Sequence, residues 1–194
     1  MTNPVLRAAL ACAGNGWPVF PCRPGRKVAA TGNGLLDATT DRAQIRKWFA
    51  AHPELNLAVA TGAPGPDVLD IGLLGQEPEA FHGLWHLREA GLLNGASAAV
   101  NTPNSGVHLY FKGSAQPSDS LPDWHMDFIA RGGYVLVPPS RVAGQPYSGA
   151  NIRGKQPGRL DWDAAVRLLD PSRTGERPSG PEPGPEPPDL EAGT

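Results

Sequence analysis

Three polar residues interrupt segments of the sequence that are otherwise apolar. Asp70 stands in VLDIG, His108 in GVHLYF and Asp127 in HMDFIA, each with an apolar neighbour on both sides. Because alternate residues of a strand share one face, these side chains converge if the three segments are adjacent strands. Two carboxylates and an imidazole in one place predict a site for a hard divalent cation and a phosphate.

A structural explanation stands beside this one. A single polar residue in a strand is more often a group that finds a local hydrogen-bond partner. The three together, each inside an apolar segment, favour a functional site. The other histidines have no such setting, and we interpret them as surface or helix-face residues without a role: His52, His82, His86 and His125.

Position 72 weakens the expected metal site. Two-metal phosphoryl transfer holds its cations about 3.5–4 Å apart, which two carboxylates at i and i+2 on one strand do well. The residue two places after Asp70 is Gly72, which supplies no side-chain oxygen. Asp67 lies on the opposite face of the strand, and Glu77 and Glu79 reach the site only if the following loop folds back.

Two kinds of stretch offer groups for a phosphate. NTPNSGVH places a tight turn before His108, and such a turn can aim backbone N–H groups at an anion, which makes Ser105 and Gly106 candidates. Lys27 in RPGRK and Arg131 beside a Gly-Gly turn add positive charge. Ordinary hairpin turns and solvated basic loops have the same composition, so that alternative stays open.

Composition limits the class of protein. The 194 residues suit one domain with a tail or two very small domains, and 40% of them are apolar. A net charge of −2 gives no global basic excess, so a nucleic-acid partner must be met by a local patch. The two cysteines have no zinc-site spacing, and no segment has the character of a signal peptide or a membrane span. We therefore expect a cytoplasmic protein without a membrane partner.

Hydrophobic patterning predicts alternating helices and strands. Helices are expected over 4–13, 41–52, 77–93 and 160–170. Strands are expected over 17–22, as hairpins over 56–72 and 96–113, and on both sides of a Gly-Gly turn within 126–140. This order predicts an α+β domain over residues 1–170, with helices on one face of the sheet and the other face open for a ligand. Residues 171–194 are rich in Pro, Gly and Glu, and we expect a disordered tail there.

The ordered set of motifs resembles a known family. The stretches GWPVFPCRPGRK, DATTD, NLAVATG, VLDIG, TPNSGVHLYF, MDFIARGGYVLVPPS and GQPY follow one another along residues 5 to 170. They resemble the N-terminal domain of bifunctional DNA primase/polymerases, the Prim-Pol branch of the archaeo-eukaryotic primases. No single motif is specific, but the ordered set is.

The resemblance implies a fold and an activity. It implies an RRM-like core, with an antiparallel or mixed sheet and helices on one face, joined to a small N-terminal unit of helices and strands. It implies template-directed nucleotidyl transfer that uses Mg²⁺ or Mn²⁺, NTPs or dNTPs, and single-stranded or primed DNA. By carry-over, Asp70 and Asp127 bind metal and His108 contacts the phosphates of the incoming nucleotide, beside Ser105, Gly106, Lys27 and Arg131.

Gly72 departs from the DxD or DxE motif that the resemblance implies, since the motif here reads Asp70-Ile71-Gly72. Two functions therefore stay open. One is a primase/polymerase with weakened catalysis. The other is a degenerate member that binds nucleotide or nucleic acid in replication, or in plasmid or phage maintenance. No helicase motif follows, so we expect any unwinding to come from a separate helicase.

Overall fold

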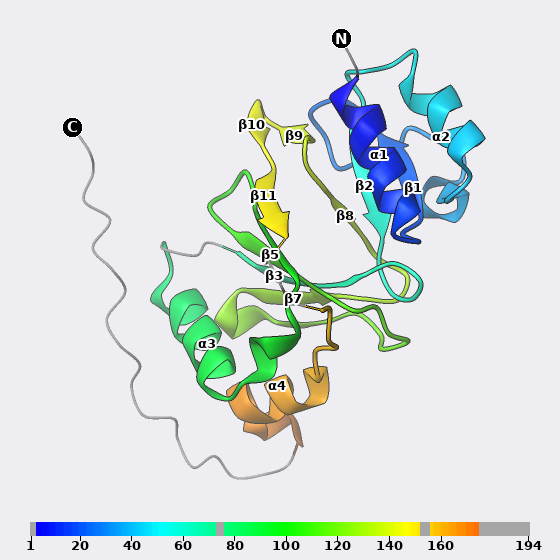
Figure 1. The fold of residues 1–194 in the computed structure, drawn as a ribbon. Helices are drawn as coiled ribbons and strands as arrows, with labels where there is room; N and C mark the ends of the chain where they lie inside the picture. Colours follow the sequence, from blue (N-terminus) through cyan, green and yellow to red (C-terminus); the bar gives the residue numbers. More distant parts are fainter. Residues whose placement is uncertain (1–2, 73–75, 152–155, 175–194) are drawn as a thin grey trace, which may run out of the picture.

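The chain folds into two main sheets, each with its own helices (Figure 1). The computed structural model describes residues 3–72, 76–151 and 156–174. The α+β class predicted from the sequence is confirmed, as is a small N-terminal unit of helices and strands.

The N-terminal unit holds a three-stranded antiparallel sheet in the order β1-β2-β8. Its strands are β1 (Val19–Cys22), β2 (Asn56–Ala60) and β8 (Tyr134–Leu136), and α1 (Pro4–Gly14) and α2 (Arg42–Phe49) pack against it. Strand β1 contains Pro21 and lies at the edge, where a missing N–H costs no ladder hydrogen bond.

The larger sheet has six antiparallel strands in the order β11-β4-β5-β3-β7-β6. Their bounds are β3 (Asp67–Ile71), β4 (Ala98–Asn101), β5 (Val107–Phe111), β6 (Asp119–Leu121), β7 (Met126–Ile129) and β11 (Ser148–Asn151). Helices α3 (Pro78–Glu89) and α4 (Trp162–Leu169) cover one face, and β9 (Arg141–Val142) pairs with β10 (Gln145–Pro146) in a short separate hairpin. No helix in the described ranges has the length and apolar character needed to cross a membrane.

One sequence prediction about strand pairing is wrong. Residues 56–62 and 66–72 do not form a hairpin, because β2 joins the smaller sheet and β3 the larger one. Strands β7 and β8 are separated in the same way, although only a Gly-Gly turn region lies between them. Both edges of β2 are occupied by β1 and β8, and both edges of β3 by β5 and β7. The chain therefore crosses between the two sheets three times, after β2, after β7 and after β8.

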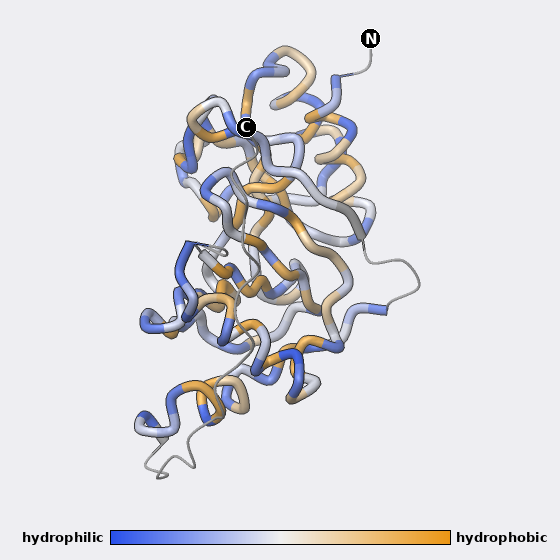
Figure 2. The backbone as a smooth tube through the Cα atoms, turned by 90° about the vertical axis from the view of Figure 1, so that its left-hand side faces the viewer, coloured by the Kyte–Doolittle hydropathy of each residue, from blue (hydrophilic) through white to orange (hydrophobic). Residues whose placement is uncertain are grey.

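Apolar side chains form two cores, one on each side of the larger sheet. Leu69 and Ile71 point to α3 and α4, whereas Val68 and Tyr110 belong to the core shared with the N-terminal unit. Orange, apolar segments run through the interior strands in Figure 2, and hydrophilic segments follow the outer loops. Asp70 shares its face with Val68, so it points toward the N-terminal unit.

The ordered chain continues slightly past the predicted domain end. Pro171–Thr174 form a 3-10 turn, and Arg173 Nη2 donates a hydrogen bond to Asp119 Oδ2 at 2.8 Å. The rest of the expected tail, residues 175–194, lies outside the described residues.

Helix α4 depends on one aromatic pair for its position on the sheet. Phe128 is fully buried and stacks on Trp162 with ring centroids 5.1 Å apart. We expect Phe128→Ala to lower the free energy of unfolding by about 3–5 kcal/mol in urea titrations, since it leaves a cavity under the helix. Phe128→Leu is the control and should cost clearly less. A loss below about 1 kcal/mol for Phe128→Ala would show that the pair does not hold the helix.

Candidate active site

The strand register places the three predicted site residues in one row. Asp70 on β3 lies directly opposite His108 on β5 and directly opposite Asp127 on β7. All three side chains share the face of the sheet that the helices leave uncovered. The structure therefore brings together the two carboxylates and the imidazole that the sequence pattern singled out.

His108 is held against Asp70. Its Nε2 lies 3.3 Å from Asp70 Oδ2, an ion-pair distance, but neither ring nitrogen has a hydrogen-bond partner with good geometry in the described part of the chain. The side chain is only 2% exposed, and the rings of Tyr110 and Tyr147 lie 6.2 and 5.8 Å away. In this conformation His108 can orient Asp70, whereas contact with a nucleotide phosphate requires the ring to turn.

Asp127 carries the electrostatic signature of a cation site. Partial burial raises the pKa of its carboxyl, and the neighbouring Asp70 carboxylate raises it further. The charge of Lys27 acts in the opposite direction and lowers it. Two like charges side by side disfavour ionisation of both, and a bound cation would remove that penalty.

The carboxylates open onto a cavity of about 310 Å³. The cavity is lined by Asp70, Gly72, Pro122, His125, Met126 and Asp127. Carboxylate oxygens that face an accessible cavity suit Mg²⁺ or Mn²⁺, which keep several water ligands. Asp70 and Asp127 therefore fit the metal role predicted from the sequence.

Gly72 lies at this cavity but gives it only backbone. Its N–H donates a hydrogen bond to the carbonyl oxygen of His125 at 2.8 Å. A Cβ built at Gly72 would meet nothing closer than that oxygen at 3.6 Å, an ordinary contact. The position therefore has room for a side chain, although none is present.

Other metal-binding groups gather nearby, around His125. One ligand atom each of Glu77, Glu79 and His125 lie within 4.8 Å of one another. His125, interpreted from the sequence as a surface or helix-face residue without a role, also lines the cavity of Asp70 and Asp127. The spacing His125-Met126-Asp127 could have suggested this, since it repeats the i, i+2 spacing of a DxD motif. Asp67 stays apart, fully buried, and accepts a hydrogen bond from Ser114 at 2.6 Å.

The predicted phosphate turn packs against the end of β3. The Gly106 N–H donates to Thr102 Oγ1 at 3.2 Å, and Ser105 has a positive φ of 59°. A Cβ at Gly106 would lie 2.6 Å from the carbonyl oxygen of Ile71, so only glycine fits there. Lys27 reaches the same region, because it lines a small cavity with Thr102 and its neighbours.

Arg131 lies away from this turn. Its backbone pairs with Pro117 and Gln116 beyond the far end of β7, against the turn at Gly62. Arg131 stands four positions after Asp127, which corresponds to roughly 13 Å along a strand. The structure therefore brings Lys27, Ser105 and Gly106 toward Asp70 and leaves Arg131 at a distance.

Comparison with known proteins agrees with this arrangement. The family model described as bifunctional DNA primase/polymerase, N-terminal (Prim-Pol), matches residues 9–162. The chain belongs to this family. Among curated proteins, none matches the sequence. The matched range contains Asp70, His108 and Asp127.

Family membership describes the Prim-Pol domain in general terms. It is a domain of the primase/polymerase-type nucleotidyltransferases, and the family implies binding of nucleotide and DNA and the use of divalent metal. The resemblance predicted from the ordered motifs is thereby confirmed.

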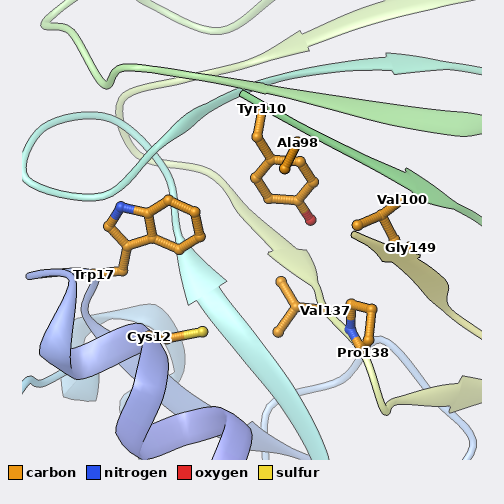
Figure 3. Close-up of a pocket in the computed structure, with 8 residues that line it drawn as sticks. All are labelled: Cys12, Trp17, Ala98, Val100, Tyr110, Val137, Pro138 and Gly149. Carbon is orange, nitrogen blue, oxygen red and sulfur yellow. The ribbon is translucent and has the colours of Figure 1, made fainter. Parts of the chain in front are cut away.

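An apolar pocket of about 150 Å³ adjoins the face of the larger sheet that carries Asp70 and His108 (Figure 3). Cys12 and Trp17 from the N-terminal unit face Tyr110 of β5 and Val137 across it. Burial raises the pKa of the Cys12 thiol to about 11, so the thiol stays protonated and unreactive at neutral pH. This pocket is part of the contact between the two units and offers no group for nucleotidyl transfer.

Metal binding by the Prim-Pol domain should depend on the ionisation of Asp127. Because the pKa of Asp127 is raised, we expect Mn²⁺ affinity to begin to fall at a higher pH than it would with an aspartate of ordinary pKa, about 3.9. Asp127→Asn should weaken Mn²⁺ binding at least tenfold, as measured by titration calorimetry. Asp163→Asn on the exposed start of α4 is the matched control. Unchanged affinity in Asp127→Asn would remove Asp127 from the ligand set.

The same raised pKa predicts an effect on stability without metal. A carboxyl whose pKa is higher in the folded state than in the unfolded chain destabilises the fold at pH values above the folded-state pKa. Below the unfolded-state pKa, about 3.9, both states are protonated and the effect disappears. We expect Asp127→Asn to stabilise the metal-free protein at pH 7 by less than about 1 kcal/mol, since the carboxyl is partly solvated. Urea unfolding at pH 7 and pH 3 measures the difference, and a gain at pH 3 equal to that at pH 7 would contradict this cause.

Proposed function

We propose that this Prim-Pol domain is a template-directed nucleotidyltransferase that adds NTPs or dNTPs to DNA, with catalysis weakened at Gly72. The observation that carries the proposal is the row of Asp127, Asp70 and His108 across three adjacent strands. The row borders an accessible cavity of about 310 Å³, and its charges favour a cation. We place the protein in the cytoplasm, where a separate helicase would open its template.

Each residue of the row has a distinct task. Asp70 and Asp127 would hold Mg²⁺ or Mn²⁺ with their carboxylate oxygens. A divalent cation there would polarise the α-phosphate and favour ionisation of the attacking 3′-hydroxyl. His108 keeps Asp70 in place through the 3.3 Å contact, and it would turn to the nucleotide's phosphates when Asp70 binds metal.

The phosphates of the incoming nucleotide would lie beside the turn before β5. Ser105 would supply a backbone N–H there, and Gly106, whose N–H donates to Thr102 Oγ1, would supply a second only by giving up that bond. Lys27 supplies positive charge close enough to affect Asp127. Arg131 could contribute only after a rearrangement, since it lies beyond the far end of β7. The proposal therefore depends on Lys27 rather than on Arg131.

Gly72 favours a second function, that of a degenerate domain which binds nucleotide or nucleic acid without transfer. Loss of one ligand oxygen weakens the hold on a second cation, and each 1.4 kcal/mol of lost transition-state stabilisation slows the reaction about tenfold. Glu77, Glu79 and His125 offer replacement ligands at the edge of the same cavity. How much activity remains depends on whether these groups replace the ligand that is missing at Gly72.

Primer extension on a single-stranded template with Mn²⁺ or Mg²⁺ tests the proposal. We expect slow extension by the wild type and a loss of more than about a hundredfold in Asp70→Ala, since a metal ligand is removed. Gly72→Asp should raise the rate at least tenfold, because the Cβ has room and a carboxylate is added. Asp163→Ala is the control for a lost surface carboxylate.

Two results would decide against transfer in the wild type. If the wild type and Gly72→Asp are both silent while nucleotide binding persists, the domain is a binding protein. If Asp70→Ala extends primers as fast as the wild type, the row of carboxylates is not the site of the reaction.

A further inference from the structure

One buried polar group plays no part in the proposed reaction. The Tyr110 hydroxyl on β5 makes no hydrogen bond within the part of the chain that the structure describes, although the side chain is only 2% exposed. Burial raises the pKa of Tyr110, so its phenol is neutral and can both donate and accept a hydrogen bond. A buried polar group that is not hydrogen-bonded carries a free-energy penalty, and a ligand that pairs with it would remove that penalty.

This hydroxyl points into the apolar pocket between the two units. Figure 3 shows the Tyr110 oxygen directed at the space between Val100 and Val137, across from Cys12 and Trp17. Cys12 and Trp17 are only half-buried, so the pocket can be reached from solvent. Apolar walls with a single oriented polar group are the combination that small-molecule sites show.

The size and shape of the pocket favour a single flat ring. Its volume is about 150 Å³, and an apolar cavity of about that volume binds one benzene molecule. The Trp17 and Tyr110 rings are nearly parallel, at 13°, with their centroids 6.0 Å apart. Aromatic walls attract another ring through offset or edge-to-face contacts at about 4.5–7 Å. We therefore expect a ligand of about six to eight heavy atoms.

The chemistry of the lining disfavours charged ligands. Of the side chains that the structure describes, those around the pocket include no Asp, Glu, Lys, Arg or His. Cys12 is neutral as well, because burial raises the pKa of its thiol to about 11. A phosphate or a carboxylate would lose its hydration here without gaining an opposite charge. A nucleobase would leave most of its polar groups unpaired, since Tyr110 offers a single hydroxyl.

The pocket lies beside the residue that holds Asp70. On the larger sheet, Val100 of the pocket lies directly opposite His108, and Tyr110 lies two residues after His108 on the same face. The Tyr110 and His108 rings are 6.2 Å apart. The pocket also joins Cys12 of α1 to strands β4 and β5, so a ligand in it would contact both units. Binding there would therefore affect His108 without occupying the carboxylate site.

We propose that this pocket is a second ligand site, separate from the carboxylates, for a small neutral aromatic molecule with one hydrogen-bonding group, such as a phenol. The ring of the ligand packs between Trp17 and the aliphatic side chains of Val100 and Val137, and its hydroxyl pairs with that of Tyr110. The ligand fastens the N-terminal unit to the larger sheet beside His108. Its regulatory meaning rests on the proposed nucleotidyl transfer, but its binding does not require transfer.

Fluorine NMR of 4-fluorophenol with the full chain tests the site, and fluorobenzene is the matched probe without the hydroxyl. We expect the wild type to bind both, and the ratio of 4-fluorophenol to fluorobenzene affinity to fall at least fivefold in Tyr110→Phe. This variant removes only an unpaired hydroxyl and should fold as the wild type does. An unchanged ratio would overturn the inference.

Filling the pocket gives a second, independent test. Ala98 lines the pocket, so we expect Ala98→Leu to weaken the binding of both probes at least tenfold. Ala11→Leu makes the same change on the exposed face of α1 and should bind both probes as the wild type does. If Ala98→Leu does not fold, the affinity ratio in Tyr110→Phe decides alone.

The histidine ring signals test the position of the ligand. Saturating 4-fluorophenol should shift the nitrogen-15 signals of the His108 ring and leave those of the exposed His52 unchanged. Equal shifts at both rings, or none at His108, would contradict binding beside the active site. This measurement needs no catalysis, so it can be made even if the domain transfers no nucleotides.

The remaining outcomes separate the pocket from the proposed reaction. The binding experiments contain neither metal nor DNA, so intact binding of 4-fluorophenol supports the pocket even if primer extension fails. A wild type that binds neither probe would overturn the inference, as would binding that a folded Ala98→Leu leaves unchanged. Tighter binding of thymine than of 4-fluorophenol would assign the pocket to a nucleobase and overturn it as well.

Discussion

The register of strand β3 is the constraint on which the rest of the structure depends. β3 pairs with β5 and β7, and this pairing sets Asp70 opposite both His108 and Asp127. A slip by one residue would turn Asp70 toward α3 and α4 and expose Leu69 and Ile71. Burial of those two apolar side chains under the helices therefore fixes the geometry of the carboxylates on the other face.

The same central strand determines where the N-terminal unit lies. The first two crossings between the sheets, after β2 and after β7, run side by side, because Thr61 donates from its N–H to Gly133 O at 3.0 Å and from its hydroxyl to Ala130 O at 2.6 Å. On β8, which follows the second of these crossings, the Tyr134 hydroxyl donates to the carbonyl oxygen of Lys27 at 2.6 Å and ties down the basic 23–27 loop. Lys27 of this loop lies close enough to Asp127 on β7 for its charge to lower the pKa of that carboxyl.

Local patterns predicted the elements and the row of site residues. Alternation with a period of two is a property of each strand alone, so Asp70, His108 and Asp127 could be found without knowing the sheet. Pairing is not local, and two apolar segments joined by a short turn predicted a hairpin that the fold does not contain. His125 was missed because its position depends on its own left-handed backbone, with φ of 50°, directly after the turn at Pro122–Trp124. Periodic patterns do not predict such a residue. The basic loop RPGRK was identified in the sequence, but its position near Asp127 depends on how the two units pack and could not be predicted locally.

The close approach at Gly106 holds the turn before β5 tightly against the end of β3. Since the turn rests on the backbone of Ile71 and Gly72, its distance from Asp70 cannot vary with the ligand. If the turn binds a phosphate and Asp70 binds a cation, the separation between the two ligands is set by the protein backbone. Such a spacing would be the same for every nucleotide, so in the proposed reaction the choice of base would be left to the template.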